Sequence, residues 1–144
     1  MECRVESVEW RMENVECGIM GNNIILDKSK DLALRIIRLY KFLCDEKKEF
    51  VLSKQVLRSG TSIGANIRES NRAQSKKEFV AKLNISLKEA DETMYWLELL
   101  HESDYIDKPA FDSIYHDVEE IIKLLVTIIK TTKTNMNKNL NSKF

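Results

Sequence analysis

The chain has 144 residues, of which 43% are hydrophobic and 32% charged, and its 23 basic side chains balance 23 acidic ones. This composition is that of a soluble globular protein, and the length suffices for one domain with a single core. No stretch of about 18 apolar residues occurs, so we expect no membrane-spanning helix. The first residues lack the basic and apolar regions of a signal peptide, so we expect none.

Residue usage also indicates the type of secondary structure and the compartment. Four Gly and one Pro are few for a chain with so many periodic apolar runs, which favours helices over strands. Cys3, Cys17 and Cys44 are odd in number and lack the spacing of metal ligands. We therefore expect reduced cysteines, no metal site and a cytoplasmic location.

Residues 1–26 form an N-terminal extension of uncertain order. Their apolar residues at three- and four-residue spacing suggest a short amphipathic helix: Val5, Val8, Met12, Val15 and Ile19. Gly18 and Gly21 would end that helix. Alternatively, Met20 is the true start and the preceding segment is an addition; the sequence does not separate these interpretations.

Two helices are predicted next. The first covers residues 28–48, with Asp27 or Ser29 as its N-cap, and carries an apolar stripe at helical spacing. The second covers residues 54–72, with Ser53 as its N-cap. Its Gly residues are poor helix formers, so they predict a close backbone approach on the core side.

Two further helices have clear start signals. Ser75 and Glu78 form a capping-box pattern that opens a helix reaching residue 102. Asp107 followed by Pro109 marks the start of the last helix. The expected core stripe of the helix over 75–102 is Phe79, Leu83, Leu87, Ala90, Met94 and Leu97.

These four helices predict an all-α fold, an antiparallel up-down-up-down four-helix bundle over residues 27–132. Residues 133–144 are rich in Asn and Lys and are predicted to be a basic disordered tail.

Apolar or small residues also occur on the faces of the second and third helices that are turned away from the core. This pattern predicts a homo-oligomer that forms through these helices. The expected interface residues are Ala65, Ala81, Ile85, Trp96 and Leu99. Alternatively, the N-terminal segment covers Trp96 and Leu99.

The run SIGANIRES at 62–70, then EF at 78–79 and SLKEA at 86–90, resembles a known family. These segments are similar to the four-helix-bundle proteins encoded within intervening sequences of bacterial 23S ribosomal RNA genes. Proteins of the same superfamily are similar to the accessory variability protein of diversity-generating retroelements. The resemblance covers about residues 24–130.

The resemblance implies a barrel-like homopentamer, which in the retroelement relatives binds nucleic acid and a reverse transcriptase. The positions that match the family form an expected structural polar network: Arg58, Ser62, Asn66, Glu69, Ser86 and Glu89. A small ligand pocket lined by some of these residues is the alternative. The chain departs from the basic retroelement proteins in being neutral overall.

Charge is strongly segregated along the chain. Residues 54–88 carry 8 basic and 2 acidic side chains, whereas residues 89–120 carry 1 basic and 11 acidic. We call the cations around the turn between the second and third helices the basic rim: Arg68, Arg72, Lys76, Lys77 and Lys82. Such a rim would attract a polyanion through its positive charge. No aromatic residue lies between these cations in the sequence, so base stacking is not expected. Ordinary solvation of these cations is the alternative.

No pattern predicts catalysis. Glu98 and His101 supply one Glu-x-x-His motif of a di-iron bundle, but a second motif is missing and His116 follows no suitable Glu. We therefore expect no enzyme and no cofactor. The leading hypothesis is an oligomeric scaffold or adaptor that associates with RNA, or with a reverse-transcriptase-like or ribosomal partner. The rival is a structural protein of a mobile or intervening element without nucleic-acid affinity.

Overall fold

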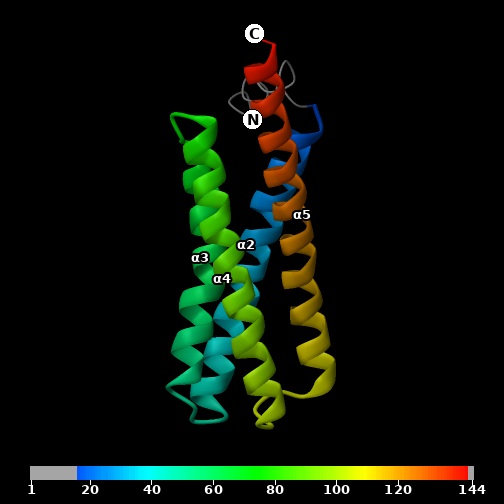
Figure 1. The fold of residues 1–144 in the computed structure, drawn as a ribbon. Coiled ribbons are helices and arrows are strands. Elements are labelled where there is room, and N and C mark those ends of the chain that lie inside the picture. The colour runs from blue at the N-terminus through cyan, green and yellow to red at the C-terminus, as the bar shows by residue number, and fades with distance from the viewer. Residues whose placement is uncertain (1–15, 143–144) are drawn as a thin grey trace.

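The computed structural model describes residues 16–142, and side chains from residue 23 onward. This part of the chain consists of four helices and no strands: α2 (Glu16–Asp45), α3 (Leu52–Ser70), α4 (Lys76–Glu102) and α5 (Lys108–Asn141). The helices run alternately up and down, so the α3–α4 turn, the start of α2 and the end of α5 share one end of the bundle (Figure 1). The predicted all-α four-helix fold is confirmed.

Each helix packs against the next one in the chain, and α2 packs against α5 to close the bundle. The diagonal pairs α2–α4 and α3–α5 have no close backbone approach. The core between the helices is almost entirely aliphatic, as expected for amphipathic helices that each bury one stripe. Its fully enclosed large side chains include Leu32, Ile36, Ile63, Leu83 and Leu125.

The glycines of α3 face α2. A Cβ atom on Gly60 would lie 2.9 Å from Cγ1 and 3.0 Å from Cγ2 of Ile36. One turn later, a Cβ atom on Gly64 would lie 3.2 Å from the Ser29 hydroxyl oxygen. The predicted close approach on the core side therefore exists, and its partner is α2.

The α3–α4 interface is held partly by buried hydroxyl groups. Ser86 donates to the Ile63 carbonyl across the interface at 2.9 Å, and Thr93 donates to Ser59 at 2.9 Å. Ser86 and Thr93 are buried where the neighbouring Leu87 and Met94 were expected, because their hydroxyl groups find hydrogen-bond partners in this interface.

Three residues of the expected stripe are only half-buried. Phe79, Leu87 and Met94 pack against the core from its margin, and Val80 and Leu100 are buried instead. Leu83, Ala90 and Leu97 lie in the core as predicted.

A glutamate caps the start of α3, and the prediction of Ser53 as the N-cap is wrong. The N-cap residue is Val51, whose side chain makes no capping bond. The Glu49 carboxylate instead accepts the backbone N–H groups of Val51 (3.1 Å), Leu52 (2.8 Å) and Ser53 (2.6 Å). A carboxylate satisfies several free N–H groups at a helix start and interacts favourably with the helix dipole.

The Glu49 carboxylate is buried, with 8% of the residue exposed. Burial alone would raise its pKa, but the bonds from Leu52, Ser53 and Val51 outweigh burial and hold the pKa below its usual value. The charged form of Glu49 is therefore part of the folded structure at neutral pH.

The start signals of the last two helices are confirmed. Ser75 accepts the Glu78 N–H at 3.1 Å, and the Glu78 carboxylate returns to accept the Gln74 N–H at 2.9 Å. Asp107 accepts the Ala110 N–H at 2.9 Å, with Pro109 in the first turn of α5.

Both outer boundaries of the bundle differ from the prediction. Helix α2 starts at Glu16 and continues through Gly18 and Gly21, which were expected to end a separate helix. The remainder of that expected helix, over Val5 to Val15, lies outside the described residues. At the other end, α5 continues to Asn141 where a disordered tail from residue 133 was expected. Met136 packs against the core, which helps to anchor these last turns.

Candidate nucleic-acid interface

The basic rim lies at the α3–α4 turn. Arg68 is in the last turn of α3, Arg72 is in the connection, and Lys76 and Lys77 form the first turn of α4. Successive backbone hydrogen bonds stabilise this turn. One of them joins the Arg72 N–H to the Glu69 carbonyl at 3.0 Å. Folding thus gathers four of the predicted cations at one end of the bundle. The reason is that a short turn joins antiparallel helices whose adjoining ends are both basic.

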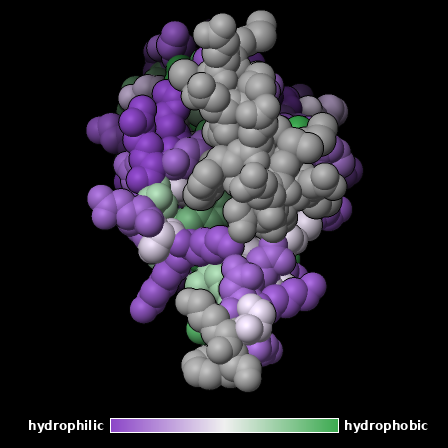
Figure 2. Space-filling model, turned by 90° about the horizontal axis from the view of Figure 1, so that it is seen from above, coloured by the Kyte–Doolittle hydropathy of each residue, from purple (hydrophilic) through white to green (hydrophobic). Residues whose placement is uncertain are grey.

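Four of the five rim cations have no acidic partner among the described residues, and Lys82 differs from them. Arg68, Arg72 and Lys77 are exposed, and Lys76 is partly exposed. Lys82 instead forms a salt bridge with Glu69, with 3.0 Å between the amine and Oε2. The view onto this end shows a predominantly hydrophilic described surface (Figure 2). The unpaired cations leave a surface that a polyanion could neutralise.

Further cations that the sequence argument left out of the site lie on α5. Lys130, Lys133 and Lys138 belong to its last turns, at the same end of the bundle as the α3–α4 turn (Figure 1). Lys133 and Lys138 fall in the tail that was expected to be disordered, whereas Lys130 lies within the predicted bundle but outside the predicted rim. The available signal was charge: no acidic residue occurs after Glu120.

The expected polar network is brought together only in part. Arg58 lies 3.6 Å from Glu89, as its predicted role requires, but its hydrogen bond is to Glu92, which the sequence argument missed. The Trp96 indole donates to the same Glu92 carboxylate at 3.1 Å. Glu69 takes no part, because it is bonded to Lys82.

These contacts shift pKa values in the cluster that Arg58, Glu89, Glu92 and Trp96 form. Hydrogen bonding to Glu92 raises the pKa of the Arg58 guanidinium. Burial works to raise the pKa of Glu92, but the bonds from Arg58 and Trp96 outweigh it and lower that pKa. Oε2 of Glu89 is shielded from solvent and has no hydrogen-bond partner, so Arg58 stabilises it through charge alone. The ion pairs of this cluster link α3 to α4.

The remaining polar positions bond to backbone carbonyl groups. Ser62 donates to the Arg58 carbonyl at 2.6 Å, and Asn66 donates to the Ser62 carbonyl at 2.9 Å, both within α3. Ser86 is bonded across the helices as described above. This is how Ser and Asn are usually satisfied inside helices. The described contacts give these residues structural roles and no shared pocket.

The residues expected at an oligomer interface differ in how far their own chain covers them. Ala65 and Ala81 are exposed, and Ile85 is 42% exposed. Trp96 is partly buried against the core, and Leu99 is also partly covered. Oligomerisation itself stays a prediction.

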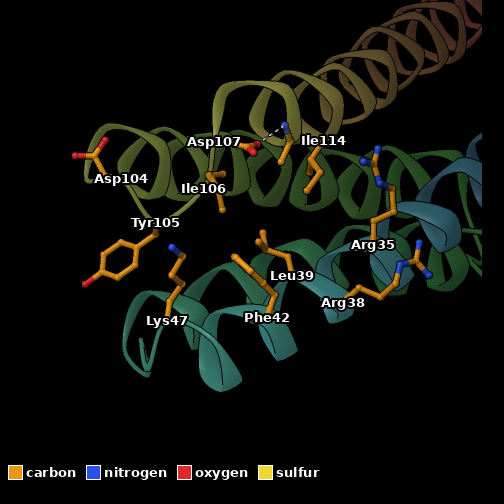
Figure 3. Close-up of a pocket in the computed structure, with 11 residues that line it drawn as sticks. Arg35, Arg38, Leu39, Phe42, Lys47, Asp104, Tyr105, Ile106, Asp107 and Ile114 are labelled. Carbon is orange, nitrogen blue, oxygen red and sulfur yellow. Dashed lines mark hydrogen bonds between the residues drawn. The ribbon is translucent and has the colours of Figure 1, made fainter.

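A cleft lies at the opposite end of the bundle, between α2 and the α4–α5 connection. Its volume is about 650 Å³, with an apolar floor that includes Leu39, Phe42 and Ile106. Arg35 lies toward one end and Tyr105 toward the other (Figure 3). The Arg35 side chain is already engaged by Asp117 at 2.6 Å, so it is not free to bind a ligand.

The candidate di-iron motif is engaged in other contacts. Glu98 accepts a hydrogen bond from Tyr115 at 2.7 Å, which raises the pKa of Tyr115 to about 12. His101 stacks on Phe111 with ring centroids 4.6 Å apart. Among the side chains described, those of residues 23–142, no three His, Cys, Asp or Glu group closely enough to hold a metal ion. None of the described helices combines the length and apolarity needed to cross a membrane.

Comparison with known proteins identifies relatives of the fold. The model of the family described as 23S rRNA-intervening sequence protein matches residues 21–127. A solved structure from Bacteroides thetaiotaomicron VPI-5482, described as a protein of unknown function from the S23 ribosomal protein family, is 60% identical. The match has a TM-score of 0.76 and covers 76% of this chain and 98% of the relative. Among curated proteins, none matches this sequence.

Proposed function

The chain belongs to the family of 23S rRNA-intervening sequence proteins, and on that premise we propose that it is a non-catalytic, oligomeric scaffold or adaptor for RNA. RNA, or a partner protein that handles RNA, binds at the basic rim. The single observation that carries this proposal is the cluster of four cations without acidic partners at the α3–α4 turn. Phosphate groups would replace the counterions around these side chains, and affinity would fall as salt rises.

The rival function is a structural protein of an intervening element with no nucleic-acid affinity. Its support is the balance of 23 basic and 23 acidic side chains, which removes any overall attraction to a polyanion. The two functions therefore differ in whether the local rim, rather than the net charge, decides binding.

Reversing two rim charges should weaken RNA binding. In the variant Lys76→Glu/Lys77→Glu, we expect affinity for a structured RNA at low salt to fall by about tenfold or more, with a shallower salt dependence. The substitutions lie in the first turn of α4, where Glu is compatible with the helix dipole, so folding should be preserved. Fluorescence anisotropy over a series of salt concentrations measures both quantities.

The matched control is Lys41→Glu/Lys54→Glu, which changes the net charge equally at the opposite end of the bundle. Both control lysines are exposed. If control and rim variants weaken binding equally, overall charge decides it and the rim has no special role. If the unaltered protein does not bind RNA at low salt, the proposed function is refuted in favour of the rival function.

The oligomer should form through the faces of α3 and α4 that are turned away from the core. Light scattering during size-exclusion chromatography should give a multiple of the 16.8 kDa chain mass, near five chains if the family resemblance extends to assembly. Ile85→Glu should shift the mass toward one chain, because it introduces a charge into the expected interface. Leu34→Glu on α2 is the control, since Leu34 is 45% exposed and Ile85 42%. A single-chain mass for the unaltered protein would refute the oligomer.

A further inference from the structure

The last turns of α5 lie beyond the residues that match the family model. The match ends at residue 127, whereas α5 ends at Asn141. Lys130, Lys133 and Lys138 therefore lie outside the matched residues.

The lysines of this region share one face of α5. At about 100° per residue, Lys123, Lys130, Lys133 and Lys138 fall within an arc of roughly 140°. All four are exposed. The opposite face holds the buried Ile121, Leu125, Ile128 and Ile129. The lysine face is thus held outward by core packing, over a length of about 22 Å from Lys123 to Lys138.

The chemistry of this face favours phosphate over other ligands. No acidic residue occurs after Glu120, and residues 121–142 contain no aromatic residue. A cationic face without aromatic residues suits a nucleic-acid backbone rather than stacked bases. A membrane surface is disfavoured, because the apolar face that would enter lipid is buried in the bundle.

We propose that the lysine face of residues 123–138, which we call the lysine arm, contacts the phosphate backbone of RNA that is bound at the basic rim. The up-down-up-down topology brings the end of α5 and the α3–α4 turn to the same end of the molecule (Figure 1). Two cationic segments far apart in the sequence therefore share one end of the bundle, where one extended RNA would contact both. This inference rests on the proposed function for the identity of the ligand and extends its site to a second helix.

The test compares salt dependence in three forms of the full chain. The probe is a labelled RNA duplex of about 20 base pairs, long enough to span both surfaces. The arm variant is Lys130→Gln/Lys133→Gln/Lys138→Gln, which removes charge and keeps helix propensity and core contacts. The control is Lys41→Gln/Lys47→Gln/Lys54→Gln, which removes the same charge at the opposite end. Circular dichroism verifies equal helix content.

We expect the arm variant to bind about 10- to 100-fold more weakly at moderate salt, with a slope of log affinity against log salt reduced by about two. The control should change affinity by less than about twofold. An arm variant with the affinity and slope of the unaltered protein would overturn the arm. If the rim variant Lys76→Glu/Lys77→Glu still weakens binding in that case, the proposed function stands without the arm.

Three other outcomes would overturn the inference. Binding that survives the rim variant and is lost in the arm variant would refute the rim, and with it the inference that arm and rim hold one RNA. An unaltered protein that binds no RNA at low salt would overturn both. Phosphatidylserine vesicles are the second probe: if the arm substitutions abolish vesicle binding and leave RNA binding unchanged, the ligand is a membrane and the inference is wrong.

Discussion

Gly60→Leu should destabilise the bundle by about 3 kcal/mol or more, a large part of the stability of a small domain. Even a single added carbon at this position would lie 2.9 Å from Cγ1 and 3.0 Å from Cγ2 of Ile36. Both atoms are attached to the branched Cβ of a fully buried residue, so they cannot turn away without moving α2. Chemical denaturation at fixed protein concentration, followed by circular dichroism, measures the loss.

Alanine substitutions at the two glycines of α3 separate packing from helix propensity. Each replaces Gly in a helix and should gain about 1 kcal/mol from propensity. At Gly64 the nearest atom is the Ser29 hydroxyl oxygen at 3.2 Å, so Gly64→Ala should be neutral or stabilising. At Gly60 the contact with Ile36 should outweigh the gain. If both alanine variants stabilise the protein equally, the α2–α3 packing is looser than described.

Glu49→Gln should destabilise the protein by about 1.5–3 kcal/mol at neutral pH, because three backbone N–H groups lose their charged acceptor. The folded-state pKa of Glu49 is lowered, so its contribution is present above the unfolded pKa of about 4.3. It is lost as pH falls through the folded pKa. The stability difference between the two proteins should therefore shrink on acidification.

Unfolding curves at pH 7 and below about pH 4 measure this change. Glu46→Gln is the control, since Glu46 is an exposed carboxylate in the same connection between α2 and α3. Its effect should be small at both values. A stability difference for Glu49→Gln that stays constant over this range would mean that the carboxylate is not the charged cap of α3.

The sequence predicts the helices well where start signals and periodicity agree. The Ser75 and Asp107 caps are correct because both residues act locally, on N–H groups three residues later. Ser53 is a plausible cap by the same rule, but α3 begins one residue earlier, and Glu49 accepts the N–H groups of Val51, Leu52 and Ser53 from outside the helix. Periodicity does not reveal this, because it depends on the path of the connection from α2 to α3. In α4, the buried Ser86 is unpredictable from hydropathy, because its acceptor lies on another helix.

The candidate site is predictable in part for similar reasons. The cluster of Arg68, Arg72 and Lys77 follows from a short turn between two basic helix ends. The partner of Lys82 does not, because Glu69 is 13 residues away and the pair forms only once α3 and α4 are packed. Lys133 and Lys138 of α5 lie in a segment whose polar composition predicts disorder. Local composition does not report that Met136 packs on the core and anchors this segment.

The order in which the helices pack has a consequence for folding. Three of the four helix–helix contacts join neighbours in the chain, and only α2 against α5 joins distant segments. Most native contacts can therefore form within helical hairpins before a long loop must close, and such low contact order is associated with folding in microseconds to milliseconds. The chain can complete most of its core as soon as α4 has been synthesised, and α5 then closes the bundle.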